Sequence, residues 1–420
     1  MDLSQAKQKD EKDPLSKFRN HFYHPKKELY FDGNSLGKLP LKAQEILHNS
    51  IQTQWGDGLI RSWNEHWLEL PKRVASKYAQ LINVENDEVC IGESTSVRLY
   101  QILHSLLNSG SFPKHLKTDI LNFPSDLYIM EGLEKEFNIL PLKVVSYPNE
   151  IEADIDKLKK DIKENPGIIC LSLVSYKSSF LYPMQQLNQW ATKHDSIIVW
   201  DLSHAIGAVD IDLKETETKI ALGCSYKYMN GGPGSPAFLY IEKALQPKLF
   251  NPIQGWFGHQ KPFDFSKNYI PAEGIDRFAS GTPSILSMAA MEAGVDLVLE
   301  AEIKTMREKS TLQSELFLKA VEHKLTPLEY AIESPLEKDR RGSHVTLSHP
   351  FSWQICQALV AGSEFHPKII PDFRPPHFIR FGITPLYTKY EAIWILVDAL
   401  KTIVETKAYL NFSKEKTIVT

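Results

Sequence analysis

The stretch GIICLSLVSYKSSFLYPMQQLNQWATKHDSIIVWD, residues 167–201, decides the fold class. Two short runs in it, 167–175 and 196–201, are almost wholly apolar, which is typical of buried parallel strands. Between them, the spacing of Leu187, Trp190 and Ala191 predicts a helix. A strand, a helix and a second strand form a βαβ unit, so we expect an α/β fold with a large domain built on a mostly parallel central sheet.

The pattern changes after about residue 285. A long helical stretch, 285–324, leads to short apolar segments at 344–349 and 378–383 and to another helical pattern at 390–407. This mixture predicts a second, smaller α+β domain, joined to the first by the long helix. The expected parts are an N-terminal arm over 1–45, a large domain over 46–285 and a small C-terminal domain over 286–420.

The composition is that of an ordinary globular protein, with 42% apolar residues, 24% charged residues and a net charge of −4. Basic and acidic residues are mixed along the chain, so we expect no nucleic-acid partner. No apolar run approaches the ~20 residues that a membrane helix needs, so we expect no membrane partner. Residues 1–13 lack the apolar core of a secretory signal, and the charged run at 7–12 predicts a solvated tail.

The cysteines have neither metal-ligand nor disulfide spacing. Each lies among apolar or small residues, which is typical of a buried free thiol in a reducing compartment. We therefore expect a cytoplasmic protein without a bound metal. The chain also lacks the P-loop, GxSxG, HExxH and GxGxxG patterns, which argues against the enzyme classes that carry them. The four cysteines are Cys90, Cys170, Cys224 and Cys356.

Polar residues follow the strand predicted at 196–201, and ligands of parallel sheets bind beyond such strand ends. Asp201 ends the strand and His204 follows three residues later. Asp201 is either a helix N-cap or a carboxylate aimed at a protonated ring nitrogen. A lone histidine is more often structural than functional, but the joint position of His204 and Asp201 makes both candidates for a site.

The stretch GCSYKYMNGGPGSP, residues 223–236, places Lys227 between two tyrosines and before a glycine-rich turn. One interpretation is a lysine whose stem covers apolar surface while its amine reaches solvent. The other is an amine held for covalent work on a carbonyl cofactor.

Two helix starts are typical of anion sites. Ser94, Thr95 and Ser96 precede a helix predicted at 97–107, and Thr282 suits an N-cap with Pro283 as the first helical residue. Most such caps bind nothing, so neither segment identifies a site by itself.

Three larger side chains are ambiguous on their own. Phe123 is either a core residue or a stacking platform, and Trp256 lies beside glycines in a predicted loop, where its N–H is a donor. Arg380 lies inside an apolar strand and needs a partner, which is either a substrate carboxylate or an internal Asp or Glu.

Taken together, several stretches resemble kynureninase, a family of fold-type-I enzymes that use pyridoxal 5′-phosphate (PLP). The match follows family order over nearly the whole chain, and the GTP sequence at 281–283 is similar to the bacterial branch. The stretches are YFDGNSLGKLP (30–40), WGDGLIRSWN (55–64), STSVRLY (94–100), FPSDLYIMEGL (123–133), WDLSHAIGAV (200–209), GCSYKYMNGGPGSPAFLY (223–240), GWFGH (255–259), SGTPSILS (280–287) and DFRPPHFIRFGITPLY (372–387).

The resemblance implies a role for each candidate. Lys227 would form a Schiff base with PLP, Phe123 would stack on the pyridine ring, and Asp201 would pair with the ring nitrogen. Arg380 would bind the substrate α-carboxylate, with Asn34 and Ser35 nearby. The remaining implied cofactor contacts are Thr95, Ser96 and Tyr226 at the phosphate, His204 beside the ring, Asp126, Ser172, Trp256 and Thr282.

The implied reaction is hydrolysis of L-kynurenine to anthranilate and L-alanine, with 3-hydroxykynurenine as a second candidate substrate. Tyr226 is the candidate proton donor, and Trp63 and Phe257 are candidates to cover the substrate ring. Family members take Trp256 and Thr282 from the neighbouring subunit, which implies a homodimer with shared active sites. The alternatives are a PLP enzyme of the cysteine-desulfurase or class V aminotransferase kind, and a non-catalytic PLP-binding homologue.

The chain departs from the family pattern at two places. The run SYKSSF at 175–180 replaces an Asn-Tyr-Arg-Thr-Gly-like run, and Arg98 stands where many members have Asn. Neither change removes Lys227, Asp201 or Arg380, so PLP chemistry is still expected.

Overall fold

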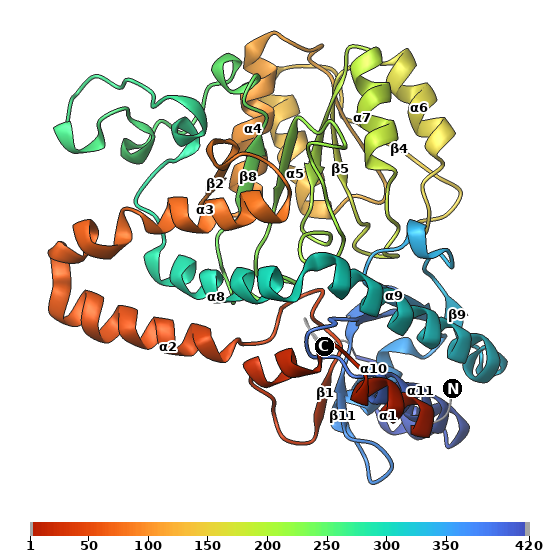
Figure 1. The fold of residues 1–420 in the computed structure, drawn as a ribbon. Helices are drawn as coiled ribbons and strands as arrows, with labels where there is room; N and C mark the ends of the chain where they lie inside the picture. The colour runs from red at the N-terminus through yellow and green to blue at the C-terminus, as the bar shows by residue number, and fades with distance from the viewer. Residues whose placement is uncertain (1–2, 416–420) are drawn as a thin grey trace.

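The computed structural model describes residues 3–415, and its larger part is built on a seven-stranded sheet (Figure 1). The strand order is β2-β8-β7-β6-β5-β3-β4, and only β8 runs against its neighbours. The predicted α/β fold with a mostly parallel sheet is therefore confirmed. The strands are β2 (Val89–Ile91), β3 (Leu116–Asp119), β4 (Lys143–Val145), β5 (Ile168–Ser172), β6 (Ile197–Asp201), β7 (Ile220–Gly223) and β8 (Phe238–Ile241).

Helices cover both faces of this sheet, because alternate residues of each strand belong to two different cores. Ile168 and Cys170 pack with α4 and α5, while Ile169 and Leu171 pack with α3, α6, α7 and α8. Burial on both faces explains why these strands are apolar almost throughout. The helices are α3 (Leu70–Leu81), α4 (Thr95–Ser109), α5 (Pro124–Phe137), α6 (Ile155–Glu164), α7 (Met184–Lys193) and α8 (Ile285–Ala301).

The single long helix predicted over 285–324 is wrong. The chain forms two helices, α8 and α9 (Ile303–Ala320), which are separated at Glu302, whose φ of 61° lies outside the helical region. The apolar pattern continues across the break, so periodicity alone did not reveal it. α8 packs in the core of the large sheet, so it belongs to the larger part of the chain. We still propose two domains, with the division near Glu302 rather than at residue 285.

The C-terminal part has its own core around a four-stranded antiparallel sheet in the order β12-β13-β10-β9. The strands predicted at 344–349 and 378–383 and the helix predicted at 390–407 are confirmed as β10, β13 and α11. Its elements are β9 (Ala331–Ile332), β10 (His344–Ser348), α10 (Ser352–Ala361), β11 (Lys368–Ile370), β12 (Asp372–Arg374), β13 (Phe378–Gly382) and α11 (Tyr390–Glu405).

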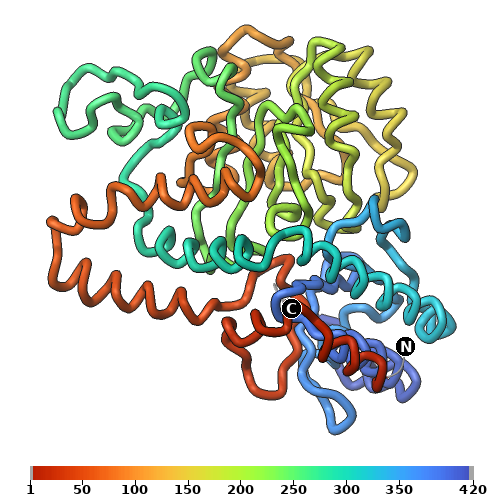
Figure 2. Tube along the Cα trace, viewed as in Figure 1, coloured from red at the N-terminus to blue at the C-terminus, as the bar shows by residue number. Residues whose placement is uncertain are grey.

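The N-terminal segment is docked on this smaller part. Residues 7–12 are mostly exposed, as predicted, but they do not form a free tail, because they lie in or next to α1 (Leu3–Glu11), which packs beside α11 (Figure 2). The Asp10 carboxylate accepts hydrogen bonds from the N–H groups of Tyr390 (2.8 Å) and Glu391 (2.9 Å), two of the unpaired donors at the start of α11. β1 (Glu28–Tyr30) then pairs with β11 in parallel.

After β1 the chain crosses to the large part through α2 (Leu41–Asn49), which packs against α8. None of the helices among residues 3–415 is long and apolar enough to cross a membrane.

The cap that Asp10 provides can be tested by Asp10→Ala. The variant leaves two N–H groups of α11 without their acceptor, so we expect the free energy of unfolding to fall by about 1 kcal/mol. Urea titration measures the change. Glu11→Ala, at an exposed neighbouring residue, is the control and should have little effect; equal stabilities of the two variants would contradict the assigned cap.

Candidate active site

The carboxyl ends of β5 and β6 bring polar side chains together. Ser172 and Asp201 are the last residues of these strands and are direct partners in the register. The Ser172 hydroxyl lies 2.6 Å from Asn122 Oδ1 and 3.4 Å from Asp201 Oδ2. A hydroxyl has one proton, so its stronger bond is to Asn122, and Asp201 Oδ2 keeps acceptor capacity for a further donor.

The other oxygen of Asp201 is used locally. Asp201 Oδ1 accepts the backbone N–H of Ser203 at 2.8 Å and the Ser203 hydroxyl at 2.5 Å. No regular helix follows Asp201, so the helix N-cap interpretation is wrong; the carboxylate holds a turn instead. The two oxygens therefore have separate tasks, one fixing the turn and one remaining available.

Lys227 lies after β7, and its amine contacts the His204 ring rather than an Asp or Glu carboxylate at the surface. Its Nζ is 2.8 Å from His204 Nε2 and 5.8 Å from the centroid of the Phe123 ring. Among residues 3–415, no carboxylate lies within ion-pair distance of this amine. The amine thus lies between the His204 imidazole and the face of the Phe123 ring. This arrangement is expected of a lysine in a functional site rather than of one that reaches solvent.

His204 is buried and neutral. Burial, followed by the charges of Lys227 and Arg380, lowers its pKa well below the ordinary value. A neutral imidazole accepts at one nitrogen only, so with the Lys227 amine as the donor at Nε2 we assign the ring proton to Nδ1. Nδ1 has no hydrogen-bond partner in the described residues, and a second buried ring, His344, lies 5.7 Å away between centroids.

Asp126 is a second buried carboxyl at the site. Burial, followed by the nearby Asp201, raises its pKa well above the ordinary value, which favours the protonated form of Asp126. Asp126 Oδ2 has no hydrogen-bond partner among the described residues. It lies in the first turn of α5.

The Phe123 ring is not a core side chain. It is 36% exposed and meets the Tyr176 ring edge-on, with centroids 5.2 Å apart. The Asn122 side chain accepts the Phe123 N–H at 2.9 Å and so fixes the ring at the start of α5. An exposed, oriented ring above the Lys227 amine suits stacking on a planar group.

A cavity of about 520 Å³ opens at the N-terminus of α4. Ser94 caps the helix through the Val97 N–H at 3.4 Å, and the Ser96 hydroxyl contacts the Ser125 hydroxyl at 3.1 Å. Helix N–H groups and hydroxyls at one cavity wall suit a phosphate. Four residues predicted from the sequence line this cavity. Three were predicted to contact the phosphate, Thr95, Ser96 and Tyr226, and Thr282 was predicted to serve the site of the neighbouring subunit.

Trp256 and Thr282 lie together, with Trp256 Nε1 donating to Thr282 Oγ1 at 3.3 Å. Thr282 lines the same cavity as Thr95 within one chain. Tyr226 lies beside Cys224, with which its hydroxyl interacts, and burial raises the pKa of Tyr226 above its ordinary value. The Tyr226 phenol is therefore protonated at neutral pH and able to donate.

Arg380 has internal partners. Its Nε donates to Asp372 Oδ2 at 2.5 Å, its Nη2 to the Ser35 hydroxyl at 3.1 Å, and its Nη1 to the Tyr176 carbonyl. The internal acid that the sequence left open is Asp372, and Ser35 does reach Arg380. Asn34 is fully buried instead, with both amide atoms unpartnered in the described residues.

Arg98 is buried behind the N-terminus of α4. It donates to the carbonyls of Gly92 (3.0 Å) and Phe278 (2.6 Å) and to Gln101 Oε1 (3.1 Å). Gln101 Nε2 continues to the Ser280 hydroxyl at 2.9 Å. Arg98 thus ties the phosphate-side helix to the loop that carries Thr282.

The run at 175–180 forms a bridge between the two parts of the chain. Lys177 pairs with Glu150, and the Thr346 hydroxyl of β10 donates to the Lys177 carbonyl at 2.6 Å. Its altered residues therefore make structural contacts, while Tyr176 contributes both its ring and its carbonyl to the site.

Sequence reasoning missed three residues of the site: Asn122, His344 and Asp372. Asn122 directly precedes Phe123 and Asp372 lies in the DFR stretch already singled out, so adjacency was an available signal. The sequence contained no signal for His344, because only the packing of β10 against the turn that carries His204 brings the His344 ring near the site.

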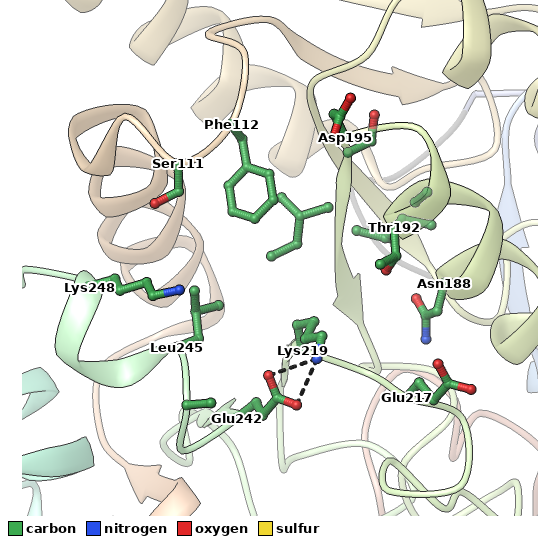
Figure 3. A pocket seen from close by; sticks show the side chains of 15 residues that line it. Ser111, Phe112, Asn188, Thr192, Asp195, Glu217, Lys219, Glu242, Leu245 and Lys248 are labelled. Carbon is green, nitrogen blue, oxygen red and sulfur yellow. Dashed lines mark hydrogen bonds and ion pairs between the residues drawn. The ribbon is translucent and has the colours of Figure 1, made fainter.

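Another cavity, of about 380 Å³, lies at the amino ends of β6 and β7, the opposite edge of the sheet (Figure 3). Its charged groups include Lys219, which pairs with Glu242 at 2.7 Å. It contains none of the candidate residues. Residues 3–415 hold no group of three or more potential metal ligands.

Comparison with known proteins identifies two family models. The kynureninase C-terminal domain matches residues 306–400, and aminotransferase class V matches residues 62–350. A kynureninase of Pseudomonas fluorescens is 36% identical over 406 residues, and one of Burkholderia mallei (strain SAVP1) is 34% identical. Each alignment covers 95% of both chains.

Solved structures with the same fold are more distant in sequence. The apo cysteine desulfurase of Thermococcus onnurineus NA1 has a TM-score of 0.79 at 16% identity, covering 93% of this chain and 98% of its own. The C-DES protein with glycine covalently linked to its PLP cofactor has a TM-score of 0.78 at 16% identity, covering 91% and 98%. These two likenesses concern the fold alone.

The Arg98 contacts can be tested by Arg98→Met. The variant leaves three acceptors at the α4 N-terminus unpaired, so we expect the free energy of unfolding to fall by about 3 kcal/mol and PLP to bind more weakly. Denaturant titration and fluorescence titration of the apoprotein with PLP measure both effects.

Arg341→Met is the matched control, because Arg341 is equally buried and donates to the carbonyls of Pro335 and Leu336 away from the cavity. It should lose stability but keep its affinity for PLP. Equal loss of affinity in both variants would show that Arg98 acts on stability alone.

Proposed function

This chain belongs to the kynureninase family, and we propose that it hydrolyses L-kynurenine to anthranilate and L-alanine by cleaving the Cβ–Cγ bond. The enzyme is a PLP-dependent hydrolase of carbon–carbon bonds, as its relatives at 34% and 36% identity indicate. The observation that carries the residue assignments is the Lys227 amine, 2.8 Å from a neutral imidazole and beneath an exposed aromatic ring.

The residues present fit the cofactor. Lys227 would hold PLP covalently, Phe123 would stack on its ring, and Asp201 Oδ2 would accept the ring N–H. Asp126 Oδ2 and His204 Nδ1 are buried polar atoms without partners in the described residues, and a polar group bound there would satisfy them. Thr95, Ser96, Tyr226 and the α4 N-terminus would hold the phosphate. When bound, PLP withdraws electrons from the attached amino acid, which activates it for cleavage.

Proton movement would fall to Lys227 and Tyr226. The neutral His204 imidazole accepts a hydrogen bond from the Lys227 amine, and this contact would orient the amine toward the substrate Cα. The Tyr226 phenol is protonated at neutral pH and would supply the proton to the three-carbon fragment after anthranilate leaves. Ser172 and Asn122 would keep Asp201 and Phe123 in place.

Substrate orientation would fall to Arg380. Its guanidinium is fixed by Asp372 and Ser35, so it offers a rigid cation to the α-carboxylate. Trp63 and Phe257 lie with ring centroids 5.9 Å apart, which supports their proposed role in covering the aromatic ring of the substrate.

A desulfurase function is disfavoured. That chemistry needs a cysteine in an accessible loop, whereas all four cysteines of this chain are buried. The buried free thiols also support our proposal of a cytoplasmic location.

We also propose a homodimer with shared active sites. Large apolar side chains are exposed on two projecting segments, the region after α2 and the loop that follows Trp256, which single chains seldom tolerate. They include Trp55 (57%), Leu59 (57%), Ile60 (76%), Phe263 (50%) and Phe265 (78%).

Lys227→Ala tests the catalytic assignment. Without the amine, covalent capture of PLP and proton transfer at Cα are lost, so we expect anthranilate release to fall by at least roughly 10²–10⁴-fold. Fluorescence of released anthranilate measures the rate, and borohydride should fix the cofactor to the wild type but not to the variant. The wild type should absorb at about 420 nm.

Lys219→Ala is the control, because Lys219 pairs with Glu242 at the opposite edge of the sheet. It should retain both covalent capture and turnover. Release of alanine from cysteine rather than from kynurenine by the wild type would overturn the proposed reaction.

Mixed dimers test the shared site. Lys227→Ala and Thr282→Ala chains, each impaired alone, are unfolded and refolded together. If Thr282 serves the partner's site, half of the dimers are mixed and each has one intact site, so activity should recover to about a quarter of the wild type. Activity equal to the sum of the separate variants would assign Thr282 to the cavity of its own chain.

A further inference from the structure

Arg380 belongs to a cluster of charges that is buried at Arg380 and Asp372 and partly exposed at Arg374. β12 and β13 are antiparallel, and their register makes Asp372 the direct partner of Arg380. Asp372 Oδ2 accepts from Arg380 Nε at 2.5 Å and from Arg374 Nε at 2.9 Å. One carboxylate thus serves two guanidinium groups, which leaves one positive charge uncompensated.

A second carboxyl, Asp32, completes the cluster from the segment after β1. The Ser35 hydroxyl accepts from Arg380 Nη2 at 3.1 Å and also interacts with the Asp32 carboxyl. Ser35 therefore bridges the two groups. Asp32 Oδ1 is buried without a hydrogen-bond partner in the described residues.

The segment that carries Asp32 is held in place. Phe31 donates its N–H to the Ile370 carbonyl at 2.8 Å and accepts from the Gly382 N–H at 2.6 Å. A Cβ at Gly382 would lie 2.2 Å from Asn34 Oδ1, so the segment packs directly on β13. Asp32 cannot move away from Arg380 without breaking these contacts.

The protonation of Asp32 is balanced near neutrality. Burial and the charge of Asp372 raise the pKa of Asp32 to about 7, although Ser35, Arg380 and Arg374 favour the ionised form. The other titratable groups that interact with it are Tyr30 on its own segment, Tyr228 after β7, Cys356 on α10 and Tyr387 after β13.

We propose that Asp32 couples binding of the substrate's α-carboxylate at Arg380 to the uptake of one proton, and so sets the affinity of the site for amino acids. With Asp32 ionised, two arginines face two carboxylates and the cluster is neutral. With Asp32 protonated, the cluster has one positive charge, which the substrate carboxylate neutralises. The protonated form therefore binds substrate more tightly, and by reciprocity substrate raises the pKa of Asp32.

This inference rests on the proposed contact between Arg380 and the substrate carboxylate. The proton comes from solvent and forms an O–H bond on the Asp32 carboxyl, so no other reactant is needed.

The test measures the dissociation constant of L-alanine for the holoenzyme between pH 6 and 8.5, from the change in cofactor absorbance. The ammonium group of L-alanine must also lose a proton to react with the cofactor, and Asp32→Asn, which keeps the shape but not the charge, measures that shared pH dependence by itself. We expect the ratio of the wild-type to the Asp32→Asn dissociation constant to rise as pH rises through about 7, by at most tenfold per pH unit. Calorimetry in two buffers of different ionisation enthalpy should show that, at pH 7.5, the wild type takes up more protons on binding than Asp32→Asn does, by up to one proton.

Two further variants keep the result interpretable. Asp161→Asn removes another partly buried, ion-paired carboxylate, the partner of Lys117 at 2.5 Å, and should keep the wild-type pH profile. Ser35→Ala removes a group that favours ionised Asp32, so the pH at which affinity falls should move upward, which is informative even if Asp32→Asn fails to fold.

The proposal is overturned if Asp32→Asn retains the wild-type pH dependence, or if the wild type and Asp32→Asn exchange the same number of protons when L-alanine binds. Failure of the proposed function would show differently, as a wild type that releases no anthranilate from L-kynurenine at any pH.

Discussion

The contact between the Lys227 amine and the His204 imidazole is the interaction on which the site depends. A lysine that met a carboxylate would be a locked ion pair, whereas this amine meets a buried ring that is kept neutral by its surroundings. The sheet makes this possible, because β6 and β7 are parallel neighbours and deliver the His204 turn and Lys227 from the same edge. Gly37 closes this edge, since a Cβ there would lie 2.3 Å from the Lys227 carbonyl.

Charge is distributed unevenly across this edge. On the ring side, burial favours the protonated form of Asp126, and Asp201 Oδ2 is left as the acceptor for a ring N–H donor. On the carboxylate side, Arg374 and Arg380 share Asp372, and Asp32 is near its titration midpoint at neutral pH. The proposed function uses both groups of charges, because the carboxylate of the bound amino acid would face the Arg380 cation and the ring N–H of PLP would face the Asp201 carboxylate.

Much of the fold and of the candidate site was predictable from the sequence. The strands ending at Ser172 and Asp201 and the helix after Ser94–Ser96 follow from short apolar runs and the polar residues beside them, and the grouping of Phe123, His204 and Lys227 follows from the resemblance to the family. Other features were not. The break at Glu302 leaves the apolar period intact, and the docking of α1 depends on a cap that Asp10 makes with residues 380 positions away.

The sequence by itself determined the α/β class and the family, and it supplied the side chains that we propose to be reactive, because all of these depend on local patterns and on residue types at fixed spacings. Only the tertiary structure decided the partner of Arg380, the neutral state of His204 and the balance at Asp32. Each of these depends on burial and on charges from segments distant in the chain, and a pKa responds to what surrounds a group in space rather than to its neighbours in sequence.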